Sequence, residues 1–591
     1  MTATTITDPQ EILRQTFGFS GFRGKQEAVV SRVLRGENTL AVMPTGAGKS
    51  LCYQLPALAR SGTAIVISPL IALMHDQIRA AKAVGIRAAA MTSADHDNAA
   101  TADRLRRGEL DLLYIAPERA TMGAFQNLLS AIDISLFAID EAHCVSEWGH
   151  DFRPDYRLLR PLLDQFQHVP RLALTATADK VTREDILHQL GIPLEGLVLA
   201  GFDRPNIRYA ITPRKNAGKQ IIDFLARNPG AGIVYAPSRK KTETIAAQIA
   251  ATGRPVGVYH AGLPPEQRAA AQAEFVRSED MVMVATIAFG MGIDKPDVRF
   301  VIHAGLPKSL EAYYQETGRA GRDGDPAEAQ LFWGATDFAQ ARQWLGEIEE
   351  NRLAAERARL NALAALVETP GCRRAILLKH FGEDPPETCD NCDNCDNPPT
   401  VLNVSEMAQK LLSAVYRTGQ SFGIMHLEKV LTGQPDDKVL ARGHDRLSVF
   451  GIVSAEDAPL LRPVMRTLMA HEMLVTTDHG GLALGPTARP VLRGEQRVSI
   501  AEPPKKKPRN RVRSQTPNPV GDPLFDALRA KRTELAQERN VPPYVIFHDS
   551  VLRAMASDRP VSPMEMAQIS GVGTKKLEAY GDAFLDVIRR F

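Results

Sequence analysis

Two series of short apolar segments dominate the first part of the chain. In the first series, helix-length stretches separate apolar runs at residues 39–43, 63–68, 111–117, 136–140 and 171–177. The second series repeats this arrangement at residues 232–238, 256–260, 281–286, 300–305 and 328–333. Runs that are apolar throughout are typical of parallel strands buried on both faces. The pattern therefore predicts two α/β domains in tandem.

The pattern changes after about residue 337. Residues 341–368 have helical periodicity, and a cysteine-rich stretch follows them. Residues 401–500 combine helical periodicity with one hairpin signal, in which Gly480 and Gly481 supply turn conformations. A stretch rich in proline and charge then predicts a flexible linker, and a last helical unit follows it. We therefore divide the chain into residues 1–205, 206–341, 342–400, 401–500, 501–521 and 522–591.

Composition and charge narrow the class of protein. The formal net charge is only +2, so a nucleic-acid binder of this composition must concentrate its positive charge locally. The first residues lack a basic start followed by an apolar stretch, and no run of about eighteen apolar residues occurs. We therefore expect no secretory signal, no membrane span and a cytosolic location. In a reducing compartment, clustered cysteines indicate a metal rather than disulfides.

Residues 43–50, Met-Pro-Thr-Gly-Ala-Gly-Lys-Ser, lie between an apolar strand and a helix. In this context, backbone N–H groups face phosphates, Lys49 reaches the terminal phosphates and Ser50 binds Mg²⁺. Met43 replaces the first glycine of the general pattern, and a glycine-rich turn without a ligand is the alternative. The predicted nucleotide contacts in this loop are Thr45, Gly46, Ala47, Gly48, Lys49 and Ser50.

Asp140 and Glu141 end another predicted strand, within the sequence Asp-Glu-Ala-His. Their carboxylates therefore project from the carboxyl end of a sheet, where open α/β sheets bind ligands. Such a pair alone is more often a solvated loop, but a phosphate loop upstream favours catalysis. We predict that Asp140 holds Mg²⁺ and that Glu141 orients and deprotonates the attacking water.

The phosphate loop, Asp140–His143, Thr175–Thr177 and a second α/β unit, in this order, resemble the motifs of superfamily 2 helicases. The resemblance implies two RecA-like domains that clamp ATP between them. It also implies roles for Gln315, Arg319 and Arg322, whose spacing places them on one face of a predicted helix. That face would contact ATP and supply an arginine finger, for which we favour Arg322. A surface salt-bridge face is the alternative.

Residues 17–26 resemble the adenine-reading motif of the RecQ family within this superfamily. The resemblance implies that Gln26 contacts the adenine edge while Phe19 and Arg23 sandwich the base. Phe19 stands where the family often has tyrosine. Packing of Phe19 against a helix is the alternative.

Residues 144–156 resemble the aromatic-rich loop of the same family, which couples DNA binding to hydrolysis. Its aromatic and charged side chains predict base stacking or DNA sensing beside the ATP site, with anchoring to the core as the alternative. The implied coupling residues are Trp148, His150, Asp151, Phe152, Arg153 and Tyr156. Residues 285–303 resemble motif V of the family, in which Gly290 and Gly292 let the backbone approach DNA phosphates or nucleotide.

Four cysteines follow with the spacing Cys-x16-Cys-x2-Cys-x2-Cys; they are Cys372, Cys389, Cys392 and Cys395. Four thiolates at this spacing predict a tetrahedral structural zinc with no ligand position left for water. A disulfide or chance clustering is the alternative. Residues 372–374 and 381–383 add to the RecQ resemblance, whereas Cys52 and Cys144 read as small packed residues.

Residues 401–500 resemble the winged-helix domain of the family. A helix at about residues 460–474 carries Arg462 and Arg466 on one face, which would contact duplex phosphates or be an exposed surface only. The hairpin near His479 is short and lacks a prominent aromatic residue, so we do not expect it to be the strand-separating wedge.

The residues from Asp522 resemble the family's HRDC accessory domain. Residues 572–576, Val-Gly-Thr-Lys-Lys at a helix start, predict phosphate binding through N–H groups and lysines. A helical packing module is the alternative. The basic run at residues 505–509 mimics a nuclear signal but fits a loose DNA tether better.

Taken together, the resemblance implies an α/β fold of two tandem RecA-like motor domains, a helical zinc-binding subdomain, a winged-helix domain and a small all-α HRDC domain. It implies an ATP-dependent 3′–5′ DNA helicase, nucleoid-associated, that uses Mg²⁺ with ATP and structural Zn²⁺ in recombination, repair and replication-fork restart. Expected partners are single-stranded and duplex DNA, including forks, tailed duplexes and junctions, and single-stranded DNA-binding protein. The alternatives are a translocase that does not separate strands and a DNA-binding scaffold with an inactive motor; intact Lys49, Glu141 and Arg322 disfavour the scaffold.

Overall fold

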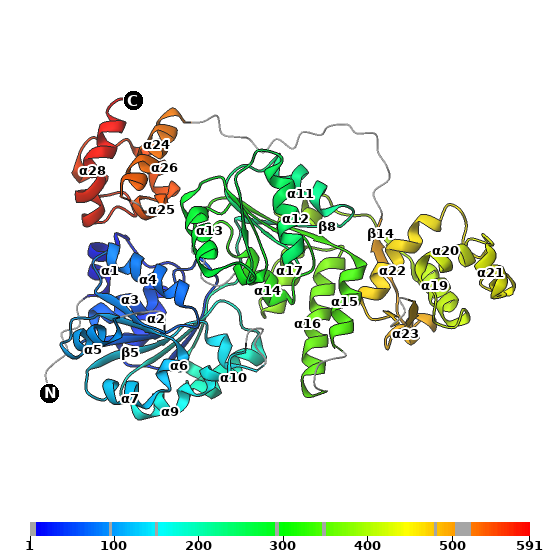
Figure 1. The fold of residues 1–591 in the computed structure, drawn as a ribbon, viewed down its shortest axis with the longest axis horizontal. Coiled ribbons are helices and arrows are strands. Elements are labelled where there is room, and N and C mark those ends of the chain that lie inside the picture. The colour runs from blue at the N-terminus through cyan, green and yellow to red at the C-terminus, as the bar shows by residue number, and fades with distance from the viewer. Residues whose placement is uncertain are drawn as a thin grey trace.

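The computed structural model describes residues 8–93, 97–147, 152–289, 295–345, 350–477, 481–502, 522–539 and 541–591. It contains two α/β lobes and three smaller parts (Figure 1). We refer to residues 8–199 as lobe 1, 207–333 as lobe 2, 335–396 as the cysteine subdomain, 401–502 as the winged domain and 522–591 as the C-terminal domain. Within the described residues, no helix has the length and apolar character that a membrane span requires.

Lobe 1 is built on a parallel seven-stranded sheet of order β3-β4-β2-β5-β6-β1-β7. Alternate side chains along each strand enter different cores: Leu40 and Val42 pack on one face, and Ala41 packs on the other. The strands are β1 Thr39–Val42, β2 Thr63–Ile67, β3 Ala88–Met91, β4 Leu112–Ile115, β5 Ile134–Ile139, β6 Arg171–Thr175 and β7 Leu197–Leu199. The predicted strands of this lobe are confirmed.

Helices cover both faces of the lobe 1 sheet (Figure 1). The first face carries α2 Gln26–Leu34, α3 Leu51–Ala59 and α4 Ile71–Ala83, with α1 Pro9–Phe17 packed on α3. The opposite face carries α5 Asn98–Arg106, α6 Pro117–Ala120, α7 Gly123–Leu129, α8 Pro154–Arg157, α9 Leu159–Gln165 and α10 Lys180–Leu190. Burial on both faces explains why the strands are apolar throughout.

Lobe 2 repeats this architecture with a parallel six-stranded sheet of order β10-β11-β9-β12-β13-β8. Its strands are β8 Ile207–Pro213, β9 Gly232–Tyr235, β10 Val256–Tyr259, β11 Val282–Ala285, β12 Phe300–His303 and β13 Ala327–Trp333. Its helices are α11 Ala217–Leu225, α12 Arg239–Ala250, α13 Pro265–Arg277 and α14 Leu310–Thr317. The five predicted strands are confirmed, and β8 adds an edge strand to them.

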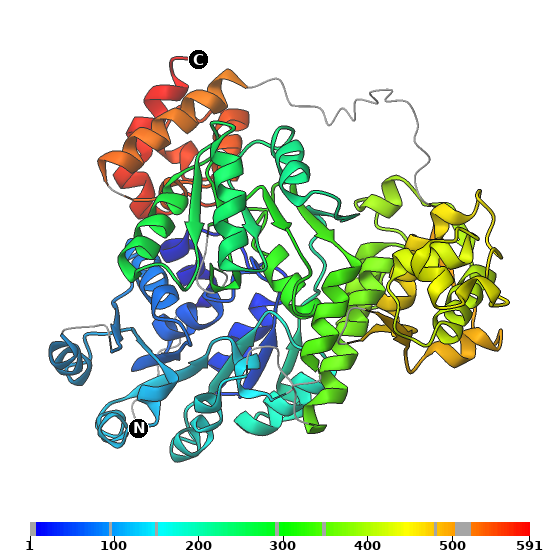
Figure 2. The same ribbon diagram turned by 45° about the vertical axis from the view of Figure 1, so that its right-hand side comes forward.

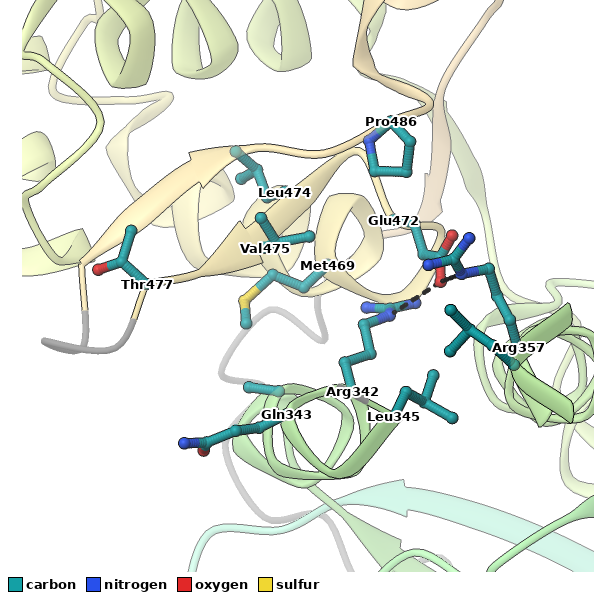
Figure 3. Close-up of a pocket in the computed structure, with 12 residues that line it drawn as sticks. Arg342, Gln343, Leu345, Arg357, Met469, Glu472, Leu474, Val475, Thr477 and Pro486 are labelled. Carbon is teal, nitrogen blue, oxygen red and sulfur yellow. Dashed lines mark ion pairs between the residues drawn. The ribbon is translucent and has the colours of Figure 1, made fainter. Parts of the chain in front are cut away.

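The cysteine subdomain lies beside lobe 2 and joins it to the winged domain (Figure 1). It consists of α15 Ala335–Leu345, α16 Glu350–Glu368, α17 Arg373–His380 and α18 Asp393–Asp396. Arg342 and Arg357 from α15 and α16 approach Glu472 of the winged domain at 3.6 and 3.5 Å. Figure 3 shows both guanidinium groups directed at this carboxylate, beside a pocket whose other wall includes Met469 and Val475.

The winged domain has its own apolar core and a short antiparallel hairpin, β15–β16. Its elements are β14 Val401–Asn403, α19 Ser405–Arg417, α20 Ile424–Leu431, α21 Asp437–Ala441, α22 Leu461–Ala470, β15 Leu474–Thr476, β16 Leu482–Leu484, α23 Ala488–Leu492 and β17 Ser499–Ala501. The tip of the hairpin, including His479, and most of the predicted linker, residues 503–521, lie outside the described residues.

The two arginines predicted on one helix face, Arg462 and Arg466, differ in their surroundings, and contact with duplex phosphates stays a prediction. Both lie on α22, but Arg462 forms a 2.7 Å ion pair with Glu428 in solvent. Arg466 instead packs toward the cysteine subdomain, where burial lowers the pKa of its guanidinium and the charge of Glu368 partly opposes this shift. The reason is tertiary: α22 packs between the winged domain's core and α16, so one of the two arginines is covered.

The C-terminal domain is helical and contacts both lobes (Figure 2). It contains α24 Pro523–Glu538, α25 Pro543–Ile546, α26 Asp549–Asp558, α27 Pro563–Met566 and α28 Thr574–Ile588. Toward lobe 2, Arg532 and Arg529 pair with Glu279 at 2.7 and 2.8 Å, and Arg553 pairs with Asp325. Two charged contacts therefore link this domain to lobe 2.

Its contact with lobe 1 includes main chain packed against main chain. The N–H of Gly571 donates to the carbonyl of Gly18 at 3.0 Å, and the backbones of Gly18 and Gly573 are in close contact. The exposed Lys575 lies against Gly85 of lobe 1. Lys576 lies over the ring of Phe547, and burial lowers the pKa of its amine to about 8. The contact of Lys576 with Phe547 agrees with the alternative of a helical packing module, and phosphate binding by residues 572–576 stays a prediction.

Candidate nucleotide and metal sites

The loop of residues 43–50 turns directly from β1 into α3, at the carboxyl end of the lobe 1 sheet. Gly46 and Gly48 have φ values of +83° and +73°, which residues with a side chain rarely adopt. The ammonium of Lys49 lies 3.3 Å from the carbonyl oxygen of Met43, so it folds over the loop's own backbone. The backbone N–H groups and this cation form a cradle for an anionic phosphate chain.

Asp140 follows the last residue of β5 and is held from two directions. The hydroxyl of Tyr156 donates to its carbonyl oxygen at 3.0 Å, and the N–H of Glu141 donates to its side chain at 3.0 Å. Burial raises the pKa of Asp140 to about 7, the charge of Glu141 adds to this shift, and Lys49 opposes it. A divalent cation at this carboxylate favours its ionised form, so the chemistry of the site fits Mg²⁺.

Glu141 has the left-handed conformation φ 48°, ψ 47°, which is uncommon for a glutamate. Its Oε2 lies 3.4 Å from Nδ1 of the buried His143, and the same nitrogen lies 3.0 Å from the hydroxyl of Thr175. Thr175 also accepts a hydrogen bond from the N–H of Thr177 at 3.2 Å. His143 therefore links the acidic pair to the end of β6. His143 is not among the predicted site residues, although its place in the sequence beside the acidic pair is a signal for such a role.

The prediction that Gln315, Arg319 and Arg322 share a helical face is wrong. Helix α14 ends at Thr317, so only Gln315 lies on it, and both arginines belong to the turn that follows. Gly318 caps the helix and Gly321 has φ +56°, a conformation that a continuing helix excludes. We call residues 318–322 the arginine turn.

The arginine turn lies against the phosphate loop across the boundary between the lobes. A Cβ atom built on Gly46 would lie 3.5 Å from both Cα and Cγ of Arg322, and one built on Gly318 would overlap the hydroxyl of Thr45. Arg319 is buried next to Tyr235; burial raises the pKa of that phenol to about 12, and the guanidinium opposes the shift. The two lobes thus bring cationic side chains to the phosphate cradle.

The side chains of the expected adenine site contact the protein itself. The amide of buried Gln26 donates to the carbonyl oxygen of Ala47 at 2.9 Å and accepts from the N–H of Arg23 at 2.9 Å. Arg23 lies 5.6 Å from the ring centre of Phe19. A sandwiched base needs about 7 Å, or two van der Waals contacts, between the groups that flank it. Arg23 is exposed, so it is free to move aside for a base.

The structure describes part of the aromatic-rich loop. Trp148, His150 and Asp151 lie outside the described residues, as do Gly290 and Gly292 of the second lobe. Phe152 is half-buried beneath the guanidinium of Arg157, and Arg153 donates to the carbonyl oxygen of Pro69 at 3.1 Å.

Tyr156 has no solvent exposure, so the prediction that it stacks on a base is wrong. Its ring belongs to the core of lobe 1, and its hydroxyl supports the backbone of Asp140. The alternative reading of this aromatic residue, anchoring to the core, is the one that its burial supports.

The sulfur atoms of Cys372, Cys389, Cys392 and Cys395 all lie within 4.8 Å of one another. The Sγ atoms of Cys389 and Cys395 are 3.9 Å apart, which is far longer than a disulfide bond. Tetrahedral zinc with bonds of about 2.3 Å separates its sulfur ligands by about 3.8 Å. The geometry therefore fits a structural Zn²⁺ bound by all four thiolates.

The sequence matches family models over nearly its whole length. These are DEAD/DEAH box helicase at residues 23–186, helicase conserved C-terminal domain at 216–324, RecQ zinc-binding at 335–396, RQC domain at 398–509 and HRDC domain at 522–588. Their order along the chain agrees with the two lobes, the cysteine subdomain, the winged domain and the C-terminal domain.

Individual proteins match over the same span. The ATP-dependent DNA helicase RecQ of Pasteurella multocida (strain Pm70) is 41% identical over 596 residues, covering 98% of this chain and 93% of its own. The protein of the same name from Bacillus subtilis (strain 168) is 38% identical over 590 residues and covers 98% of both chains. The RecQ-like DNA helicase BLM of Xenopus laevis is 32% identical over 98% of this chain and 46% of its own.

Proposed function

The chain belongs to the RecQ family of ATP-dependent DNA helicases, and from this premise we propose that it moves 3′–5′ along single-stranded DNA and separates duplex strands as it moves. One observation carries the mechanistic part of the proposal. The arginine turn of lobe 2 lies against the phosphate loop of lobe 1, with Arg322 next to Gly46. A nucleotide in this loop therefore contacts both lobes, and its hydrolysis changes the contact between them.

The chemical roles follow from charge and position. Lys49 binds the terminal phosphates, Ser50 and Asp140 hold Mg²⁺, and Glu141 orients and deprotonates the attacking water. When bound by these residues, Mg²⁺ would neutralise charge on the phosphate oxygens. Thr45, Gly46, Ala47 and Gly48 supply backbone contacts to the phosphates.

The second lobe completes the site. Arg322 contacts the transferring phosphate as the arginine finger, Arg319 adds positive charge behind it, and Gln315 contacts the nucleotide from the end of α14. At the other end of the nucleotide, Gln26 exchanges its bond to Ala47 for the adenine edge, and Phe19 and Arg23 separate to admit the base.

The aromatic-rich loop, residues 144–156, couples DNA binding to the nucleotide site. Phe152 and Arg153, with Trp148, His150 and Asp151 of the same loop, contact single-stranded DNA and transmit its presence to the acidic pair. The backbone between residues 152 and 156 supports this coupling, because Tyr156 donates to the carbonyl oxygen of Asp140.

We further propose that the enzyme acts on forks, tailed duplexes and junctions in recombination, repair and fork restart, in the cytoplasm with the nucleoid. Single-stranded DNA-binding protein is its proposed protein partner. These assignments rest on the family alone.

An unwinding assay tests direction and strand separation together. Purified enzyme is supplied with 3′-tailed, 5′-tailed and blunt duplexes, with a Lys49→Ala variant as the control that lacks the phosphate-binding cation. We expect displacement from the 3′-tailed duplex by the wild type alone. Displacement that prefers the 5′ tail contradicts the direction, and ATP hydrolysis without displacement from any substrate favours a translocase.

A further inference from the structure

Arg204 lies in the short segment that joins the two lobes, and its side chain is buried. One guanidinium nitrogen donates to the carbonyl oxygens of Thr45 at 2.7 Å and Gly318 at 3.1 Å. The other terminal nitrogen donates to the carbonyl oxygens of Ala320 and Gly321, both at 2.9 Å. Arg204 therefore bonds the phosphate loop of lobe 1 and the arginine turn of lobe 2 with one side chain.

The chemistry of arginine suits this position. A guanidinium is planar, carries five N–H donors in a fixed arrangement and has no acceptor, so it can bond several carbonyl oxygens at once. Burial lowers the pKa of Arg204, yet an arginine in a protein stays protonated. The bound carbonyl oxygens compensate for the lost water. A lysine has fewer donors, which converge on one point, and an apolar side chain has none.

The four bonds are unequal in what they join. Three of them end on the arginine turn, which belongs to lobe 2, and one ends on Thr45, which belongs to lobe 1. A separation of the lobes in which Arg204 stays with lobe 2 would break the bond to Thr45 and keep the other three. The bond to Thr45 is therefore the one that would depend on closed lobes.

We propose that Arg204 is a positioning residue for ATP hydrolysis, which holds the arginine turn at the phosphate loop so that Arg322 reaches the transferring phosphate in the closed state. This inference rests on the proposed ATPase site. Arg204 lies in the interlobe segment, outside the motifs of the two lobes, so the inference gives this segment a role in catalysis.

The segment around Arg204 is held independently by the cysteine subdomain. Phe202 stacks on Phe381 with ring centres 4.6 Å apart, and Arg374 donates to Asp203 at 2.8 Å. Asn391, between two of the zinc cysteines, donates to the carbonyl oxygen of Pro205 at 2.8 Å. Removal of the Arg204 side chain thus leaves the path of the segment fixed, and we expect the variant to fold.

Asn206 provides a matched control. Its side-chain amide donates to the carbonyl oxygens of Gly321 and Asp325, both at 2.8 Å, so it supports the same turn. These bonds stay within lobe 2 and do not reach the phosphate loop. Comparison of Arg204→Ala with Asn206→Ala therefore separates contact across the lobes from simple support of the turn.

The test measures kcat and KM for ATP in the presence of single-stranded DNA for the wild type, Arg204→Ala, Arg204→Lys and Asn206→Ala. We expect Arg204→Ala to lower kcat about tenfold or more while KM changes less than about threefold, because the bonds act in the closed state. Arg204→Lys should recover part of the loss, and Asn206→Ala should stay within about threefold of the wild-type kcat. Thermal unfolding and zinc content of each variant confirm that it is folded.

Two results overturn the inference: a kcat for Arg204→Ala within about twofold of the wild type, or equal losses in Arg204→Ala and Asn206→Ala. If Arg204→Ala does not fold, Arg204→Lys tests the inference in its place. A kcat of Arg204→Lys equal to that of the wild type then excludes a role for the guanidinium's several N–H donors. Absence of ATP hydrolysis by the wild type itself counts against the proposed ATPase and leaves the two failures distinguishable.

Discussion

At Glu141 the backbone adopts a left-handed conformation that costs on the order of 1–3 kcal/mol for a residue with a side chain. The neighbouring groups impose it: Tyr156 holds the carbonyl of Asp140, and His143 joins the end of β6 at Thr175. The strain places the Glu141 carboxylate beside His143 at 3.4 Å, at the carboxyl edge of the sheet. Such strain is typical of functional sites.

Replacement of this carboxylate gives a direct prediction. Glu141→Gln keeps the size of the side chain and removes the base, so we expect kcat for ATP to fall about 10²-fold or more. Binding of a fluorescent ATP analogue should change only a few-fold, because the phosphate loop is intact. Steady-state hydrolysis and equilibrium titration measure the two quantities. A kcat within about tenfold of the wild type contradicts the assignment.

The position of a single site residue could be predicted from the sequence where a motif fixes the conformation of the backbone. Lys49 and Asp140 each follow a strand that the apolar pattern predicts, so their places at one edge of the sheet could be foreseen. Tyr156 could not be assigned, because only tertiary packing decides whether an aromatic residue in a polar segment is buried. Arg204 stands in no motif, and its partners are main-chain atoms that no sequence pattern reveals.

At the scale of elements, the missed strands have identifiable causes. Strand β3 consists of three alanines and a methionine, which lack the β-branched and aromatic side chains that mark strands. Strand β8 lies at the edge of its sheet, and its half-buried second position and two exposed last positions interrupt the apolar run that marks the central strands. The prediction of a helix that continues through the arginine turn was wrong, because residue spacing alone does not show that the helix ends at Gly318 and Gly321.

Two histidines inside the winged domain predict a pH dependence of its stability. His426 on α20 and His444 are both buried, and their ring nitrogens lie 2.8 Å apart. Burial lowers the pKa of both imidazoles; His444 and Lys438 lower that of His426 further, and Asp436 opposes the shift. Because the unfolded histidines bind protons more readily, stability is retained above about pH 6.5 and decreases as the pH falls below it.

Thermal unfolding at pH 7.5 and pH 5.5 measures this effect, and a His444→Gln variant is the control. We expect the transition of the winged domain to move to lower temperature at pH 5.5 in the wild type, and to move less in the variant, which has one fewer buried imidazole. A shift of equal size in both proteins would assign the acid sensitivity to other groups.

The cysteine subdomain predicts a consequence of metal loss. Cys392→Ser removes one of four ligands, so we expect zinc content to fall from about one equivalent per chain to well below half, and the subdomain to lose stability. Cys144→Ser is the control, because Cys144 is buried in lobe 1 away from the cluster. Metal analysis and thermal unfolding follow the two changes. Full zinc content in Cys392→Ser would exclude the four-cysteine site.

At the scale of the whole molecule, the C-terminal domain is linked to lobe 2 by ion pairs that are partly exposed to solvent. Charges at this depth are screened by salt, whose Debye length is about 8 Å at physiological ionic strength. Glu279→Arg reverses the partner of both Arg529 and Arg532 and places like charges in contact. We expect the domain to separate from lobe 2 and the radius of gyration from solution scattering to increase.

The control for this prediction exchanges the second pair. Asp325→Arg alone should also expand the molecule, and adding Arg553→Asp should restore the compact form because the pair is re-formed in the opposite sense. High salt should expand the wild type in the same direction. An unchanged radius of gyration in Glu279→Arg would mean that the Arg553–Asp325 pair and the main-chain contact with lobe 1 together are sufficient for docking.

The main-chain contact between Gly18 and Gly573 restricts substitution more at one of these two glycines than at the other. A methyl group on Gly18 would lie 2.6 Å from the backbone nitrogen of Gly573, and Gly18 also has φ +73°, so any substitution there is penalised twice. A methyl group on Gly573 would meet its nearest neighbour at 3.4 Å, with an ordinary φ of −80°. In homologues that keep this contact, we therefore expect substitutions at the position of Gly573 before substitutions at the position of Gly18. We expect a homologue without glycine at position 18 to lack the contact.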